Sequence, residues 1–249
     1  ESDLADKLLA FRQQQDGFLV PSFNPISGSG PNGAIVHYRA IAGADRELAS
    51  DDLLLLDSGG HYRDGTTDIT RTIAIGTPPN GAVAAYSHVL QSHIHLAMAK
   101  FPTGTNGKQL DAIARAPLWA VGLDFAHGTG HGVGHVLSVH EGPANISKRG
   151  DVALEAGMVL SNEPGYYQTG DWGIRIENLI VVTPAKQTGF LEFETITLCP
   201  LDRRLIDKTL LDAGEIGWID HYHRAVYEQL HPHLSPMAKS WLEVACCPL

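Results

Sequence analysis

Four carboxylates and one imidazole of this 249-residue chain have the types and settings of metal ligands: Asp57, Asp68, His131, Glu163 and Glu177. Each lies where an apolar run ends or where a glycine-rich or polar segment begins. Carboxylates inside a core are costly unless they are paired or bound to a metal. If the five side chains converge, they would hold two divalent cations, whose four positive charges match the four negative charges of the acids. A two-metal site of this kind activates water for hydrolysis.

The types of the proposed ligands limit which metal ions would bind but do not identify one ion. Mixed oxygen and imidazole ligation suits Mn²⁺, Fe²⁺, Co²⁺ or Zn²⁺ better than Mg²⁺ or Ca²⁺. For Asp57 alone, which follows four leucines, a strand that ends in a solvated acid is an equally good interpretation. The equivalent settings of all four acids favour the metal site.

Two hairpins of similar sequence must position the acids. The first covers residues 53–75 and contains Asp57 and Asp68, and the second covers residues 158–182 and contains Glu163 and Glu177. In each hairpin one acid ends an apolar strand and the other lies on the returning strand, so the pair comes close together. This weak internal repeat indicates two pseudo-symmetric halves with a site between them.

The remaining patterns predict the other elements. An amphipathic helix is expected at residues 2–15, with Phe11 on its apolar side, and further helices at 81–101, 107–121, 212–230 and 235–245. Residues 18–31 read as a loop, whereas residues 34–42, which include His37, and residues 190–199 read as strands.

A second cluster of histidines lies in a glycine-rich segment, residues 127–135. Its four glycines would each cost about 1 kcal/mol in a helix, so we expect an irregular loop or a strand with its backbone close to the substrate. Clustering favours a functional role for His127 and His131, whereas His135 is interpreted as an ordinary histidine.

Composition limits the function. The net charge of −10 argues against nucleic acid and anionic membranes as partners, and no apolar run approaches a membrane span. The three cysteines form no CxxC pair, which favours a reducing compartment and a cytoplasmic protein. Gly28, Gly30 and Gly33 satisfy the GxGxxG pattern, but prolines interrupt the segment and a strand is expected after it, so dinucleotide binding is disfavoured.

The chain resembles the catalytic domain of aminopeptidase P (Xaa-Pro aminopeptidase), within the pita-bread metallopeptidases. The resemblance rests on five segments: Asp64-Gly-Thr-Thr-Asp68-Ile-Thr-Arg-Thr, His127-Gly-Thr-Gly-His131-Gly-Val-Gly, Val139-His-Glu-Gly-Pro143, Asn162-Glu-Pro-Gly-Tyr-Tyr167 and Gly173-Ile-Arg-Ile-Glu-Asn178. It implies an α+β pita-bread fold of two pseudo-symmetric halves around a curved antiparallel sheet. The whole chain, 1–249, would be one catalytic domain with a helical tail at 212–249, and the creatinase-like N-terminal domains of the family would be absent.

The resemblance also implies roles. Asp57 would chelate one metal, Asp68 and Glu177 would bridge both, and His131 and Glu163 would complete the second site, with two Mn²⁺ ions expected. The attacking group would be a bridging water or hydroxide, and Glu163 would accept its proton.

The same resemblance assigns the surrounding residues. His37 and His140 would contact the substrate around the scissile carbonyl and could donate hydrogen bonds to the developing oxyanion. His127 would lie on the proline side of the cleft, and Arg175 would orient the acids beside it.

The implied reaction removes an N-terminal residue from peptides with proline at position two. Two alternatives remain. Prolidase or another pita-bread hydrolase is the first, and hydrolysis of Gly-Pro but not of Arg-Pro-Pro would favour it. A non-catalytic binding module of the same fold is the second, although the chain keeps every ligand position. Homodimerisation is a family expectation.

Overall fold

The first predicted hairpin is confirmed and forms two strands of a three-stranded sheet. In this computed structural model, which describes residues 1–249, β3 (Asp52–Ser58) lies between β2 (Ile26–Ser29) and β6 (Ile69–Ile75). Asp57 pairs with Thr70 in the antiparallel register, so Asp68 precedes the paired segment by one residue. The turn of the hairpin contains β4 (Gly60–Tyr62) and β5 (Gly65–Thr66), which pair with each other and, through β4, with β1 (Phe18–Pro21).

A six-stranded sheet contains the second predicted hairpin. In spatial order its strands are β7 (Lys100–Pro102), β14 (Phe190–Thr195), β13 (Asn178–Pro184), β10 (Val159–Asn162), β8 (Gly130–Val133) and β9 (His140–Ile146). Asn162 pairs with Asn178, which places Glu163 and Glu177 just beyond the paired ends. The chain between them forms a separate ribbon of β11 (Gly165–Gln168) and β12 (Trp172–Arg175).

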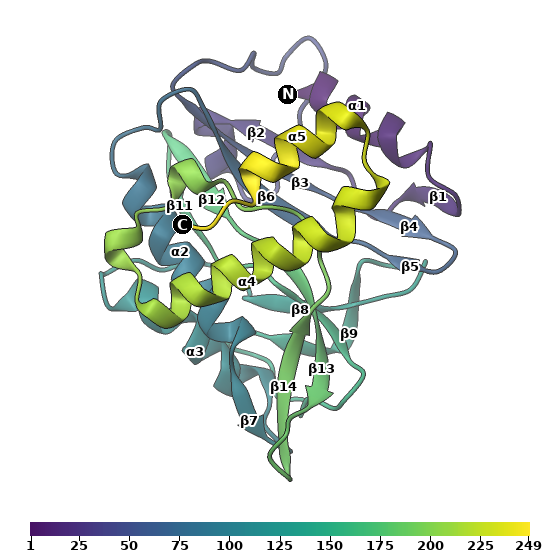
Figure 1. Ribbon diagram of the computed structural model, residues 1–249, viewed down its shortest axis with the longest axis vertical. Coiled ribbons are helices and arrows are strands. Elements are labelled where there is room, and N and C mark those ends of the chain that lie inside the picture. The colour runs from purple at the N-terminus through teal and green to yellow at the C-terminus, as the bar shows by residue number, and fades with distance from the viewer.

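Five α-helices surround the sheets: α1 (Ser2–Arg12), α2 (Ala82–Ala97), α3 (Gly107–Trp119), α4 (Ala213–Leu230) and α5 (Pro236–Ala245). Capping boxes at Asn106 and Asp212 satisfy free backbone N–H groups at the starts of α3 and α4. In Figure 1, α4 passes in front of the strands, while α2 and α3 lie together at one side. None of the helices combines the length and apolar character needed to cross a membrane. Short 3₁₀ turns occur at η1 (Gly30–Ala34), η2 (Arg203–Leu205), η3 (Lys208–Leu210) and η4 (His231–His233).

Two apolar clusters hold these layers together. The larger one packs α2 and α4 against β3 and β12 and includes Leu53, Leu90 and Ile174, all buried. The smaller one packs α3 against the six-stranded sheet through residues such as Leu110 and Ile180. The acids lie at or next to strand ends, where the chain leaves these cores. Packing in the cores therefore holds the strands in place, and the strand ends determine where the acids lie.

Three local expectations were wrong. Residues 34–42 do not form a strand, because Pro31 and its neighbours form η1 and the chain continues as turns. Tertiary contacts stabilise this irregular path: the buried carboxylate of Glu1 accepts hydrogen bonds from Ser29 N and Tyr38 Oη. Residues 18–31 contain β1 and β2 instead of being loop throughout. The helix expected at residues 2–15 ends at Arg12, and Phe11, placed on its apolar side, is 51% exposed.

Two buried histidines should make the free energy of unfolding fall in acid. His93 Nε2 accepts a hydrogen bond from Asn178 Nδ2, and His223 Nε2 accepts one from Leu201 N. Burial lowers the pKa of His93 to about 3 and that of His223 to about 4. Between pH ~6.5 and these values the unfolded chain binds protons that the folded chain does not, so the free energy of unfolding falls as the pH falls, by about 1.4 kcal/mol per pH unit for each histidine.

We therefore expect His223→Gln to reduce the difference in urea unfolding free energy between pH 7 and pH 5. His221→Gln is the matched control, because His221 lies exposed on the same helix. Equal pH dependence in His223→Gln and the parent chain would contradict the assignment of this acid sensitivity to buried imidazoles.

Candidate metal centre

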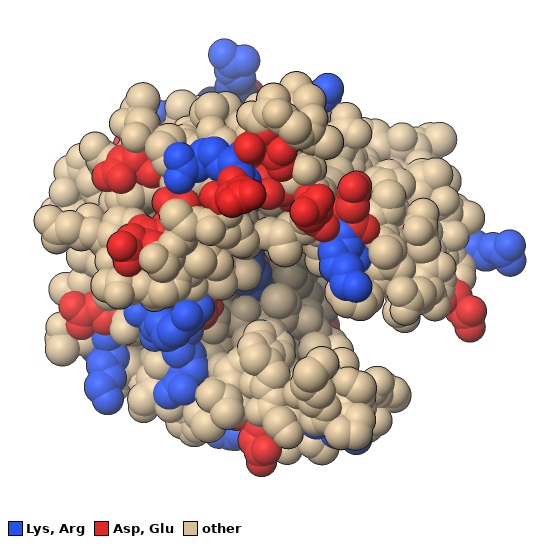
Figure 2. All heavy atoms as spheres, turned by 90° about the horizontal axis from the view of Figure 1, so that it is seen from above, with Lys and Arg blue, Asp and Glu red and all other residues tan.

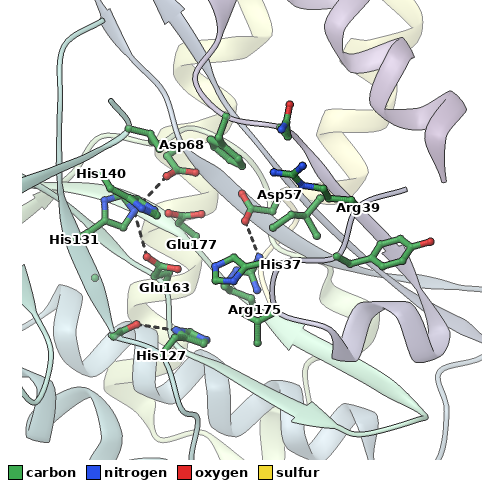
Figure 3. A pocket seen from close by; sticks show the side chains of 18 residues that line it. His37, Arg39, Asp57, Asp68, His127, His131, His140, Glu163, Arg175 and Glu177 are labelled. Atoms are coloured by element: carbon green, nitrogen blue, oxygen red, sulfur yellow. Dashed lines mark hydrogen bonds and ion pairs between the residues drawn. The ribbon is translucent and has the colours of Figure 1, made fainter. Parts of the chain in front are cut away.

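Every residue predicted for the site lines one cavity of about 580 Å³. Its lining includes the five proposed ligands and four further predicted residues, His37, His127, His140 and Arg175. Figure 3 shows these side chains pointing toward one another from strands of both hairpins, β8 and β9 and the turn after η1. Seen from above, the surface of the molecule is deeply hollowed, and Asp and Glu side chains gather along one side of the hollow (Figure 2). Residues more than 100 positions apart in the chain therefore share one solvent-accessible space.

Asp68, His131 and Glu177 form the centre of the cluster. Each offers one ligand atom, and these atoms lie within 4.8 Å of one another. His131 Nε2 lies 3.4 Å from Asp68 Oδ2 and 3.4 Å from Glu163 Oε1. His131 Nδ1 lies 2.9 Å from Gly132 O, so its N–H donates to this carbonyl and the lone pair of Nε2 is left for a cation. Four of the predicted ligands are thus in contact or near contact.

Asp57 lies at the other side of Glu177 in Figure 3 and is engaged differently. Its Oδ2 is 2.6 Å from Arg175 Nη2, and the Arg175 side chain is almost completely buried. Asp57 Oδ1 and Glu177 Oε1 are buried and have no hydrogen-bond partner in the protein. An unsatisfied buried acceptor costs about 1–3 kcal/mol, and more when it is charged. These two free oxygens beside Asp68 fit a cation, so the residues present suit a two-metal centre.

The acids of the cluster also disfavour one another's ionisation. Burial, followed by the charges of Asp68, Glu163 and Asp57, raises the pKa of Glu177 well above its ordinary value. Burial and neighbouring acids also raise the pKa of Asp68, and burial raises that of Glu163. In the absence of cations the cluster therefore retains protons, and a divalent cation would replace them.

Side chains from neighbouring strands orient the carboxylates. Thr70 Oγ1 donates to Glu177 Oε2 at 2.8 Å, and Ser161 Oγ donates to Glu163 Oε1 at 2.9 Å. The same Ser161 oxygen accepts the backbone N–H of His131. Neither Thr70 nor Ser161 was predicted, although the alternation of side chains along a strand places Thr70 on the same face as Asp68.

The predicted histidines surround the cluster in different environments. His140 lies edge-on to His131, with ring centroids 4.0 Å apart, and its pKa is lowered by burial and by the nearby His131. His37 is exposed on the turn after η1 and reaches the same cavity. His127 is largely enclosed, and burial lowers its pKa to about 4. These three histidines line the same cavity as the acids, and their roles in the site remain predictions.

Tyr167 is a site residue to which sequence analysis assigned no role. Its hydroxyl accepts a hydrogen bond from Arg175 Nη1 at 2.7 Å and lies 2.8 Å from His127 Nε2. His127 Nδ1 faces the carbonyl of Gly128, so Tyr167 donates to Nε2. A continuous chain of hydrogen bonds therefore runs from Asp57 through Arg175 and Tyr167 to His127.

The register of the β11–β12 ribbon makes this chain of bonds possible. Arg175 pairs with Gly165, and Tyr167 pairs with Gly173, so each large side chain faces a glycine. A Cβ atom on Gly165 would lie 2.8 Å from the Tyr167 hydroxyl, and one on Gly173 would lie 1.8 Å from Gly33 O. The glycines of the Glu-Pro-Gly and Gly-Ile-Arg motifs thus keep space for the Tyr167–Arg175 contact and for η1.

We expect Tyr167→Phe to lower the free energy of unfolding by about 1–3 kcal/mol, because a buried guanidinium N–H and a buried imidazole nitrogen lose their partner. Urea denaturation measures the change. Tyr166→Phe is the matched control, because the Tyr166 hydroxyl bonds only the exposed Gln168 side chain, and we expect less than about 0.5 kcal/mol there. Equal effects of the two substitutions would contradict the importance of the buried network.

Two buried arginines hold the backbone segments that contain site residues. Arg71 has no carboxylate partner and donates to the carbonyls of Thr70, Glu177 and Cys199. Arg71 therefore ties the segment before α4 to the short link between β12 and β13 that contains Glu177. Arg115 on α3 donates to His127 O and pairs with Asp111 at 2.8 Å, which holds the start of the histidine-rich segment. Both were missed, because arginines that bond backbone carbonyls leave no sequence pattern.

The glycines of the histidine-rich segment serve close strand packing. A Cβ on Gly130 would lie 1.9 Å from Ser161 O, and one on Gly132 would lie 2.1 Å from Glu141 O. The expected close approach of this backbone is therefore present, but at these two positions it is to β10 and to the chain at the start of β9, not only to the cavity.

The fold is that of the pita-bread metallopeptidases. Residues 1–184 match Metallopeptidase family M24, and residues 189–249 match the C-terminal region of peptidase_M24. The chain belongs to metallopeptidase family M24.

Similar proteins agree with this assignment. The chain is 47% identical over its whole length to a probable Xaa-Pro aminopeptidase P of Laccaria bicolor and 48% identical over 97% of its length to aminopeptidase P2 of Arabidopsis thaliana. It covers 40% and 35% of those proteins, so it spans about two fifths of their length.

Solved structures show the same fold. An X-prolyl aminopeptidase of Caenorhabditis elegans, described as a cytosolic enzyme with a di-nuclear active site, is 44% identical with a TM-score of 0.95 over all of this chain and 42% of its own. Prolidase of Pyrococcus furiosus is 32% identical with a TM-score of 0.70 over 78% of this chain and 54% of its own.

Proposed function

We propose that this chain is the catalytic part of an aminopeptidase that hydrolyses the bond between an N-terminal residue and a penultimate proline. The observation that supports the proposal most is the convergence of four carboxylates and one imidazole on one cavity, with two buried carboxylate oxygens left without partners. The relatives named as Xaa-Pro aminopeptidases match the whole chain, which extends the argument from site to substrate.

Two Mn²⁺ ions are the proposed cofactors, with Zn²⁺, Co²⁺ and Fe²⁺ as alternatives of similar ligand preference. Asp57 would hold one cation, Asp68 and Glu177 both, and His131 and Glu163 the other. When bound, such cations lower the pKa of water and polarise a carbonyl group. A prolyl bond has no N–H, so a site that needs no donor from the scissile amide suits this substrate.

The protein's own residues supply proton transfer and orientation. Glu163 is the proposed proton acceptor, because Ser161 fixes one of its oxygens and burial favours its protonated form. It would then pass the proton to the proline nitrogen. His37 and His140 would donate hydrogen bonds to the carbonyl oxygen, while His127 and Arg175 would shape the side that receives proline.

The cellular location of the protein is also a proposal. The Caenorhabditis elegans structure is described as that of a cytosolic enzyme, and we propose a cytoplasmic location for this chain as well. Organisation of residues 1–249 as one catalytic domain and homodimerisation remain predictions.

Cleavage of a blocked peptide separates the candidate functions. With Mn²⁺ added, we expect release of free alanine from Ala-Pro-Ala amide and close to two equivalents of bound metal. Hydrolysis of Gly-Pro without cleavage of the amide would instead favour a prolidase, which the structural likeness to the Pyrococcus furiosus enzyme keeps open. Absence of both reactions in the metal-loaded chain would favour a binding module.

A further inference from the structure

Arg39 is a cation in the cavity whose guanidinium has no partner in the protein. It follows His37 by two residues and lines the same cavity as the proposed ligands. No hydrogen bond or ion pair of the chain involves its side chain, whereas Arg175, the other arginine of the lining, is engaged by Asp57 and Tyr167. Figure 3 shows the Arg39 guanidinium turned into the cavity beside Asp57, on the side away from His127.

The backbone that carries Arg39 is held in place. The hydroxyl of its neighbour Tyr38 donates to Glu1 Oε2 at 2.8 Å and accepts from Asn32 Nδ2 at 2.9 Å. The backbone N–H of Arg46 donates to the same Glu1 oxygen at 3.0 Å, so both ends of the turn are anchored on one buried carboxylate. Arg39 therefore extends from a fixed turn into the cavity.

The charge of the occupied cavity favours an anionic group. Two divalent cations would compensate the four carboxylates, which leaves the positive charges of Arg175 and Arg39. Arg175 contacts Asp57 directly, so Arg39 is the cation available to a ligand. A guanidinium matches a carboxylate with two parallel hydrogen bonds.

We propose that Arg39 binds a carboxylate of the substrate, so that the site selects acidic peptides among those with proline at position two. The inference rests on the proposed function. The carboxylate comes either from the side chain of the first residue or from the C-terminus of a short peptide. The position of Arg39 on the side away from His127, the proposed proline side, favours an Asp or Glu as first residue.

Three amide- or acid-ended peptides distinguish the two sources: Asp-Pro-Ala amide, Asn-Pro-Ala amide and Asn-Pro-Ala with a free carboxylate. In the Mn²⁺-loaded chain we expect kcat/KM to be about 10-fold higher for the Asp peptide than for its Asn isostere, as one charge-assisted contact allows. Arg39→Gln should reduce this ratio to about 2 or less, and Arg39→Lys should retain part of it. Arg149→Gln is the control, because it removes the same charge at an exposed position outside the cavity.

Each outcome decides the proposal. If Arg39→Gln loses the preference for the Asp over the Asn peptide and Arg149→Gln keeps it, Arg39 recognises the side chain of the first residue. If Arg39→Gln instead loses a preference for the free acid over the amide, Arg39 recognises the C-terminus. If the Asp-to-Asn ratio and the acid-to-amide ratio of kcat/KM are both the same in Arg39→Gln as in the parent chain, the proposal is overturned.

If no peptide is hydrolysed, the proposed function fails, and calorimetric titration of the Asp and Asn amides onto the Mn²⁺-loaded parent chain and onto its Arg39→Gln variant still tests Arg39. Removal of Arg39 must then weaken binding of the Asp peptide about 10-fold relative to the Asn peptide. Equal weakening of both peptides, or of neither, overturns the proposal.

Discussion

Glu163→Gln is expected to lower kcat for Ala-Pro-Ala amide by about 10³-fold or more. The substitution keeps the size of the side chain and one oxygen, but it removes the negative charge and the capacity to accept a proton. Loss of a general base alone costs about 10²–10⁴-fold. Glu163 Oε1 also lies 3.4 Å from His131 Nε2, so a weakened metal site would add to the loss.

Metal content measured on the same sample separates these two causes. A variant that keeps its metals and still loses kcat identifies Glu163 as a proton-transfer group, whereas loss of metal identifies it mainly as a ligand. Glu155→Gln, which changes an exposed acid outside the cavity, should retain parental activity. Parental activity in Glu163→Gln would exclude both roles.

Removal of the metals is expected to abolish hydrolysis and to lower the thermal midpoint by roughly 10 °C. The physical reason is the cost of four carboxylates that share one cavity, three of which have a raised pKa when no cation is present. A ligand present at a thousand times its Kd stabilises a fold by about 4 kcal/mol, and 1 kcal/mol shifts the midpoint by about 2–4 °C at this chain length.

Thermal unfolding with excess Mn²⁺ and with a chelator measures this difference. The double variant Asp68→Asn, Glu177→Gln removes two of the charges that the cations compensate, so its midpoint should hardly respond to Mn²⁺. An equal midpoint of the parent chain in both conditions would contradict a metal centre built from these acids.

Much of the fold was predictable because its elements are marked locally. The apolar runs before Asp57 and Glu163 end at polar, glycine-containing turns, and both predicted hairpins are present. The helices α2, α3, α4 and α5 begin within one residue of the predicted starts or at them, and two of them begin at capping boxes. Strand alternation and helix caps are properties of short segments, so they can be recognised without the rest of the chain.

The turn that carries His37 and Arg39 could not be predicted in this way. Its residues have the composition of a strand, but Glu1 anchors it through Ser29, Tyr38 and Arg46. Contacts between residues up to 45 positions apart outweighed local propensity here, as tertiary contacts often do for β-forming residues.

Residue type and setting singled out the five proposed ligands and His127, whereas His37, His140 and Arg175 were assigned only through the family resemblance, and all nine line the cavity. The sequence could not show that Arg175 engages Asp57, that Tyr167 links Arg175 to His127, or that Arg39 lacks a partner. Those relations depend on which side chains meet after the two hairpins and the turn after η1 pack together. Residue type limits what chemistry a side chain can do, whereas hydrogen bonding and charge compensation depend on distances that exist only in the folded chain.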